Sequence, residues 1–101
     1  MNTILIAEIR LENDSKLIVK PVTGAFPYIY RAGLSVYWDD AGQYLYTDLF
    51  QGQSLPGGFK RLAKAAQEEY NIILKITDRT VWEGIPTAVR GMPQFGRGWQ
   101  G

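Results

Sequence analysis

Two runs of β-forming residues joined by a tight-turn sequence constrain this chain more than any other feature. The segments YIYRAGLSVYW (28–38) and QYLYTDLF (43–50) flank Asp39, Asp40, Ala41 and Gly42. Asp and Gly favour the tight turns that connect antiparallel strands. The sequence therefore predicts a long antiparallel hairpin at the centre of the fold.

The register of this hairpin decides which side chains meet, because a slip of one residue moves every side chain to the opposite face. A four-residue loop at 39–42 makes one face almost wholly apolar, with the pairs Trp38–Gln43, Val36–Leu45, Leu34–Thr47 and Ala32–Leu49. The other face then carries Tyr37–Tyr44, Ser35–Tyr46, Gly33–Asp48 and Arg31–Phe50. A three-residue loop with Gly42 in a bulge is also ordinary hairpin chemistry, but it sets Leu34 against Asp48 and mixes the faces. We prefer the four-residue loop, which predicts one core face and one tyrosine-rich face.

Residues 3–22 predict another hairpin by their alternation of apolar and polar side chains. A three-residue loop at Asn13, Asp14 and Ser15 gives the pairs Glu12–Lys16, Glu8–Lys20, Leu11–Leu17 and Ile9–Val19. Ion pairs and apolar pairs then agree on one register. Ile4 and Ile6 break the alternation, which predicts that this end of the strand is buried on both sides.

The second half of the chain predicts one helix and two short strands. Phe59, Leu62, Ala63, Ala66 and Tyr70 recur at helical spacing, Ser54 suits a cap or loop position, and Asn71 suits a helix stop. Residues 72–77 and 80–85 have strand character. We therefore predict a single α+β domain over residues 1–84, with an antiparallel sheet of five or six strands (β-β-β-β-α-β(-β)) and one amphipathic helix packed on one face. Residues 85–101 form a Gly/Pro-rich tail, expected to be loop or disordered.

The predicted core follows from these assignments and consists of Leu5, Ile9, Leu11, Leu17, Val19, Leu34, Val36, Leu45, Leu49, Phe59, Leu62, Ala66 and Leu74.

The chain has 101 residues, a net charge of +1, no cysteine and no histidine. A single domain of this size holds a core without disulfides. The two absent residue types exclude thiol nucleophiles, thiolate metal sites and histidine acid/base chemistry, so only carboxylates, Lys, Tyr, Ser and Thr remain. We expect no cofactor and no metal. Because no segment resembles a signal peptide or a membrane span, we expect a soluble, cytoplasmic protein without membrane contact.

Several polar clusters suggest binding or catalysis, and each has a simpler interpretation. Asp39 and Asp40 with Asp48 could bind a divalent cation, but Asp pairs are common in turns. The glycines at 52, 57 and 58 ahead of a helix suggest an anion site, but they lack the spacing of a phosphate-binding loop. A basic helix face with a Gly, Arg and aromatic tail could contact an anion or nucleic acid, although a net charge of +1 attracts nucleic acid weakly; its members are Lys60, Arg61 and Lys64.

The sequence favours a non-enzymatic binding or self-associating module of otherwise unspecified function. Its predicted contact surface is the tyrosine-rich sheet face, built from Arg31, Tyr37, Tyr44, Tyr46 and Phe50. Aromatic residues and Arg are enriched at the centres of interfaces. We expect the partner to be a second copy, in a homodimer or larger assembly, while a protein or small-molecule ligand, RNA binding and a histidine-free enzyme remain alternatives. The tail, with Phe95 and Trp99, could instead fold back over these rings.

Overall fold

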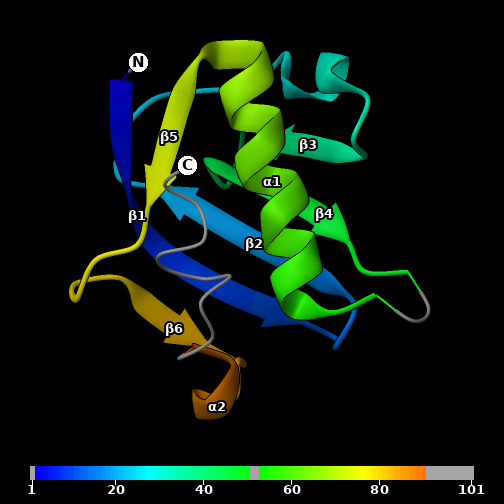
Figure 1. The fold of residues 1–101 in the computed structure, drawn as a ribbon, viewed down its shortest axis with the longest axis vertical. Helices are drawn as coiled ribbons and strands as arrows, with labels where there is room; N and C mark the ends of the chain where they lie inside the picture. The colour runs from blue at the N-terminus through cyan, green and yellow to red at the C-terminus, as the bar shows by residue number, and fades with distance from the viewer. Residues whose placement is uncertain (1, 51–52, 91–101) are drawn as a thin grey trace.

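The computed structural model describes residues 2–50 and 53–90, which form one mixed sheet with a long helix on one side (Figure 1). The strand order is β3-β4-β2-β1-β5, and β6 also pairs with β1. The elements are β1 (Asn2–Glu12), β2 (Lys16–Pro21), the 3-10 helix η1 (Ile29–Ala32), β3 (Val36–Asp39), β4 (Tyr44–Asp48), α1 (Leu55–Tyr70), β5 (Ile72–Lys75), β6 (Val81–Glu83) and the short helix α2 (Thr87–Arg90). The predicted α+β class, with one helix packed on one face of the sheet, is confirmed.

The hairpin of β1 and β2 has the predicted register. Glu12 pairs with Lys16 and Glu8 with Lys20 across the three-residue loop. Asn13 (φ 53°) and Asp14 (φ 58°) adopt the left-handed backbone that this loop requires, and Asn and Asp tolerate it better than most residues.

A β-bulge in β1 corrects the expectation that Leu5 lies in the core. The pairing of β1 with β2 shifts between Ile6 and Glu8, and the extra residue exchanges the two faces of the strand. Ile6 is therefore buried, while Leu5 is 42% exposed. The two isoleucines that break the alternation face the core, and this end of the strand is not buried on both sides.

The strand predicted from Tyr28 onwards begins only at Val36, which is a second correction. Phe26 and Ile29 are buried and hold residues 22–35 against the core, so this segment cannot lie flat in the sheet. Gly33 (φ 73°) and Ser35 (φ 60°) are both in the left-handed region, which interrupts an extended backbone.

The register of the central hairpin differs from the prediction by two residues. Its loop is residues 40–43 rather than 39–42, with Gln43 at φ 57°. Val36 consequently pairs with Thr47, and Tyr37 with Tyr46. Because side chains alternate with a period of two, a shift of two residues leaves every side chain on its predicted face.

Helix α1 begins and ends with the two caps that the sequence suggests. The Ser54 Oγ accepts a hydrogen bond from the Gly57 amide at 3.1 Å, and Asn71 ends the helix in the left-handed conformation at φ 56°. Gly57 and Gly58 thus lie inside the first turn, not in a loop ahead of it. A Cβ atom on Gly58 would meet the Leu49 side chain, so this glycine lets the helix approach the sheet closely.

The last two strands pair in parallel with β1, which departs from a wholly antiparallel sheet. α1 carries the chain back along the sheet, so β5 runs in the same direction as β4 and also β1. β6 continues along the same edge of β1 after an interruption at 76–80. The sheet otherwise consists of antiparallel pairs.

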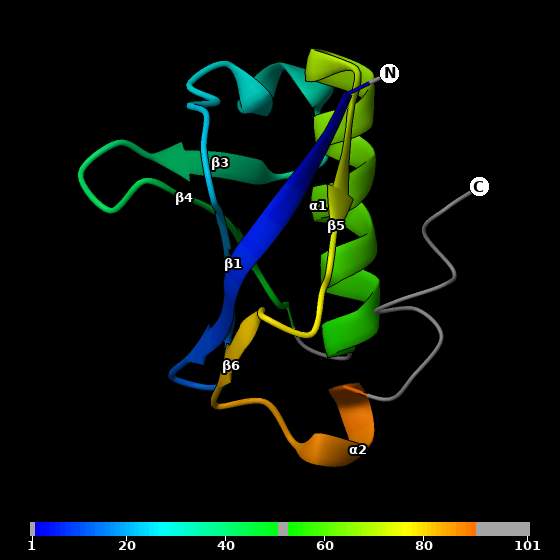
Figure 2. The ribbon, with the colours of Figure 1, turned by 90° about the vertical axis from the view of Figure 1, so that its left-hand side faces the viewer.

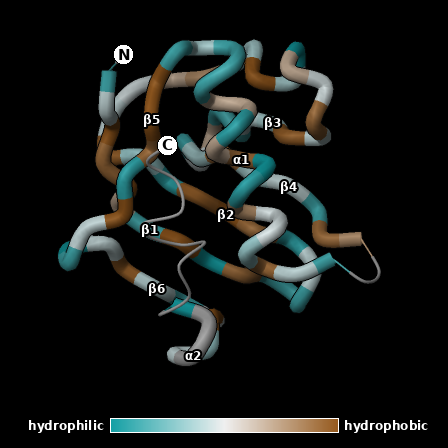
Figure 3. The backbone as a smooth tube through the Cα atoms, in the orientation of Figure 1, coloured by the Kyte–Doolittle hydropathy of each residue, from teal (hydrophilic) through white to brown (hydrophobic). Residues whose placement is uncertain are grey.

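The core lies between the sheet and α1, where Figure 3 shows the hydrophobic stretches of β1, β2 and β5. Leu11, Leu34 and Leu49 only border it. Ile85, which the sequence assigns to the tail, is 3% exposed and belongs to the core, and α2 follows it. The remaining tail, residues 91–101, lies outside the described residues. Within the described part of the chain, no helix is long and apolar enough to cross a membrane.

Candidate functional site

Three tyrosines from β3 and β4 form a cluster of rings in contact on the sheet face opposite α1, which we call the tyrosine face (Tyr37, Tyr44 and Tyr46). The ring centroids of Tyr37 and Tyr46 are 5.6 Å apart, and those of Tyr44 and Tyr46 are 6.1 Å apart. Figure 2 shows α1 on one side of the sheet only. Tyr37 is 42% exposed, and the other two rings are half-buried. The structure therefore brings these three predicted site residues together on one sheet face.

The turn between β3 and β4 fixes the position of Tyr44. The Asp39 Oδ2 accepts a hydrogen bond from the Gly42 amide at 2.8 Å, and the Tyr44 ring lies where a Cβ atom on Gly42 would stand. The Trp38 Nε1 donates to the Asp40 Oδ1 at 3.4 Å. Both aspartates thus serve the turn, and no group of three metal-ligating side chains occurs among the described residues.

Two cations from the neighbouring strands lie over the tyrosine rings. The Lys16 Nζ is 4.4 Å from the Tyr46 ring centroid and 5.7 Å from that of Tyr44. The Arg10 guanidinium is 5.9 Å from the Tyr44 ring. Each such contact restricts a ring and stabilises its orientation by about 0.5–1 kcal/mol. The rings are consequently pre-organised.

Arg10, rather than Lys16 or Lys20, forms the ion pairs with Glu12 and Glu8. Its guanidinium nitrogens lie 3.3 Å from a Glu12 oxygen and 3.9 Å from a Glu8 oxygen. Lys16 turns to the tyrosines instead, and Lys20 forms no ion pair with the described residues. The predicted register is correct, but the predicted Glu–Lys ion pairs within this hairpin are not formed.

An isoleucine lies beneath the rings and cations on this outward face. Ile18 pairs with Arg10 on one side and with Tyr46 on the other, and it is only 1% exposed. Sequence reasoning did not assign Lys16, Arg10 or Ile18 to the site. The available signal was Ile18, the one apolar residue among positions 16, 18 and 20, which share the outward face of the strand.

The outer sheet face carries charges of both signs in nearly equal number. Register places four cations and five carboxylates on it among the described strand residues, namely Arg10, Lys16, Lys20, Lys75, Glu8, Glu12, Asp39, Asp48 and Glu83. A surface with this balance has no excess of positive charge to attract phosphate groups. The tyrosine face is therefore poorly suited to stacking the bases of a nucleic acid.

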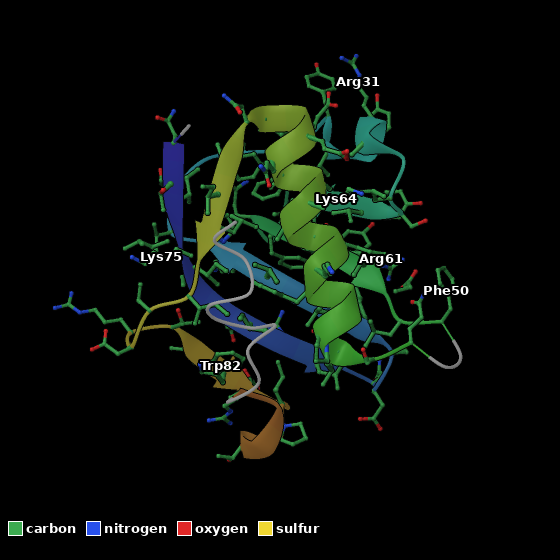
Figure 4. The ribbon with its side chains drawn as sticks, in the orientation of Figure 1. Arg31, Phe50, Arg61, Lys64, Lys75 and Trp82 are labelled. Atoms are coloured by element: carbon green, nitrogen blue, oxygen red, sulfur yellow. The ribbon has the colours of Figure 1, made fainter. Side chains whose placement is uncertain are left out.

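Two residues predicted for the tyrosine face lie elsewhere. Arg31 belongs to η1, where its guanidinium is 4.5 Å from the Tyr28 ring centroid. Phe50 is 56% exposed in the connection between β4 and α1. Figure 4 shows these two side chains well apart, with Arg31 at the top of the view and Phe50 at its right-hand side. Both differences follow from the ends of the strands, because β3 begins only at Val36 and β4 ends at Asp48.

The predicted basic helix face is divided between structural and exposed side chains. Arg61 donates to the Asp48 carbonyl oxygen at 2.9 Å and to the Gln53 Oε1 at 3.1 Å, so it holds the β4 to α1 connection in place. Lys60 and Lys64 are exposed on the outer surface of α1, where Figure 4 shows Lys64 beside Arg61. With Arg61 occupied, the predicted members of this face that remain for an anion are Lys60 and Lys64, which lie one helical turn apart.

Comparisons with known proteins place the chain in a family. The model of the family described as "Integron Cassette Protein Hfx_Cass5" matches residues 4–80, so the chain belongs to that family. A solved structure described as "Structure from the mobile metagenome of North West Arm Sewage Outfall: Integron Cassette Protein Hfx_Cass5" is 26% identical, with a TM-score of 0.48. That similarity covers 89% of this chain and 90% of the other. No curated protein matches the sequence. Neither family description names an activity.

Proposed function

We propose that this chain is a non-enzymatic module that associates with a second copy of itself through the outer face of its sheet. The observation that carries the proposal is the cluster of Tyr37, Tyr46 and Tyr44, with Lys16 over two of its rings, on a face that no described helix covers. Solvated sheet faces are usually polar and flexible. This face offers rigid rings, which lose little conformational entropy when a partner binds.

The chemistry of the face favours a protein partner over the alternatives. Tyrosines supply apolar area and a hydroxyl group at each contact, as in the centres of protein interfaces. The lack of net positive charge among the described residues of this face disfavours nucleic acid. Cations and anions occur side by side, so that one copy can present a positive group where the other presents a negative one. A surface of mixed charge is therefore suited to binding the same surface of a second copy.

Gel filtration with light scattering tests the proposal on the full chain. The informative variant is Tyr44→Lys, because Tyr44 is half-buried on the outer face of β4 and its replacement leaves the core intact. Tyr30→Lys is the control, since Tyr30 is 52% exposed but lies in η1, away from the tyrosine face. We expect a dimeric wild type, a dimeric Tyr30→Lys variant and a Tyr44→Lys variant shifted towards monomer.

Two results would overturn the proposal. A wild type that stays monomeric at millimolar concentration has no self-association to explain. If truncation after Arg90 destabilises such a monomer, the rings are covered from within the chain instead. Equal dimerisation of the Tyr44→Lys and Tyr30→Lys variants would place the dimer contact on another surface.

A further inference from the structure

The outer sheet face consists of rows of side chains that cross the strands, and the strands differ in chemistry. One row runs through Val81 on β6, Glu8 on β1 and Lys20 on β2. A second contains Glu83, Arg10, Ile18 and Tyr46, and a third contains Glu12, Lys16 and Asp48. From edge to edge the face is thus apolar or acidic on β6, mainly acidic on β1, basic on β2 and aromatic on β4.

This order of charges distinguishes between the two simple ways in which two such faces can meet. If the two-fold axis runs across the strands, β2 lies over β2, and Lys16 faces Lys20 of the second copy. If the axis runs along the strands between β1 and β2, each row faces the same row of the second copy in reverse order, so that β1 lies over β2 and β6 over β4. Lys20 then meets Glu8 of the second copy, and Lys16 meets Glu12. Only the second arrangement brings opposite charges together.

We infer that the second copy binds face to face, about a two-fold axis that runs along the strands between β1 and β2. Two lysines of each copy then contact two glutamates of the other, in the pairs Lys20–Glu8 and Lys16–Glu12. This inference rests on the proposed function and adds the orientation of the partner. Aligned packing of two sheets, with their strands within about 30° of each other, is the common geometry for faces of this kind.

Two otherwise unexplained features of the face agree with this arrangement. Lys20 is exposed and has no ion-pair partner among the described residues, because Glu8 lies with Arg10. Val81 is 57% exposed in the same row. Extending that row by one strand beyond Lys20 reaches β4 at Tyr44, so the two-fold axis places Val81 against Tyr44 of the second copy. Both side chains gain a contact.

Association through the open edge of β3 is the less suitable alternative. β3 has only four residues, and short edge strands resist pairing with another chain. Asp39 at its end turns its carboxylate back to Gly42. The face therefore offers a larger surface than the edge.

The test exchanges charges between copies. Lys20→Glu or Glu8→Lys alone places like charges opposite each other at two positions of the dimer, and each should raise the dissociation constant by about tenfold or more. In a mixture of the two variants, the introduced glutamate of one chain faces the introduced lysine of the other, and the two unchanged residues also form a pair of opposite charge. We expect the mixture to form heterodimers of nearly wild-type affinity. Lys60→Glu, on the exposed surface of α1, is the control and should leave the dissociation constant unchanged.

Mixing two chains is essential because Glu8 and Lys20 are also cross-strand neighbours within one chain. Rescue in a double variant could arise inside the monomer, whereas rescue in the mixture arises only between chains. Sedimentation equilibrium gives the dissociation constants, and native mass spectrometry with one variant labelled with ¹⁵N counts the heterodimers.

The outcomes separate this inference from the proposed function. Preferential heterodimers support the inferred orientation. A wild-type dimer that neither charge variant weakens, or that both weaken without rescue in the mixture, overturns the orientation and leaves self-association in place. A monomeric wild type overturns both.

Discussion

Thr80 lies between β5 and β6, the two strands that pair with the same edge of β1. Substitutions can separate the contribution of its hydroxyl group to stability from that of its methyl group. It is 6% exposed, its Oγ1 donates to the Ile6 carbonyl oxygen at 2.7 Å, and it accepts from the Thr77 amide at 3.0 Å. Between β5 and β6 the chain leaves the edge, so this hydroxyl replaces the backbone donor that a continuous strand would offer to Ile6. Thr80→Val keeps the shape but leaves both backbone groups without that partner.

The expected cost follows from the two groups that lose their partner. An unsatisfied buried donor or acceptor costs about 1–3 kcal/mol, which gives roughly 2–6 kcal/mol for the pair. Thr77 is half-buried, so water recovers part of this penalty, and we expect Thr80→Val to lower the free energy of unfolding by about 2–4 kcal/mol. Thr80→Ser keeps the hydroxyl and loses one methyl group, which costs about 1 kcal/mol.

Urea denaturation of the two variants measures this difference, provided that their m-values agree with that of the wild type. Hydrogen exchange of the Thr77 amide should also accelerate in Thr80→Val and change little in Thr80→Ser. If the serine variant loses as much stability as the valine variant, the methyl group rather than the hydroxyl holds this junction, and the argument from the two hydrogen bonds is refuted.

Two further predictions concern stability and are measured by chemical denaturation of the monomer. Leu62→Ala should cost about 2–5 kcal/mol because Leu62 is fully buried, and Tyr37→Ala should cost far less; equal losses would mean that the core lies on the other face of the sheet. Asn71→Ala should cost about 1–2 kcal/mol because Asn71 ends α1 in the left-handed conformation, whereas Asn71→Gly should be neutral or stabilising; equal effects of Ala and Gly would contradict this account of the helix end.

The hairpin of β1 and β2 could be predicted to the residue because its constraints are local. Charged pairs, apolar pairs and a loop of Asn, Asp and Ser all specify one register. The same holds for the helix ends, where Ser54 and Asn71 carry the signal in their own side chains. Local and global preferences coincide at these positions.

The bulge in β1 and the late start of β3 could not be predicted because tertiary contacts decide them. Ile6 faces the core only because the extra residue of the bulge shifts the alternation of side chains by one position. The alternation in the sequence alone cannot show where such a residue lies. Residues 28–35 have strand-forming side chains, but burial of Ile29 and of Phe26, whose ring packs against Trp38 and Tyr70, removes them from the sheet. Packing overrides propensity there.

Part of the candidate site could be predicted because a two-residue shift in the register of the hairpin keeps each side chain on the same face of the sheet. Tyr37, Tyr44 and Tyr46 kept a common face through that shift, whereas Arg31 depended on a strand that does not exist. Lys16 could not be assigned to the site at all, since its position depends on the pairing of β2 with β4, strands that are separated in sequence by η1 and β3.

This non-local pairing gives the outer face the property on which self-association depends. Without β2 beside β4, the three tyrosines would form a solely aromatic patch that any apolar surface could contact. With it, basic β2 lies between aromatic β4 and mainly acidic β1, and the order of the strands gives the face a direction. A directed charge pattern discriminates between orientations of a partner, because the wrong orientation places like charges together. The fold therefore supplies specificity that the tyrosines alone would lack.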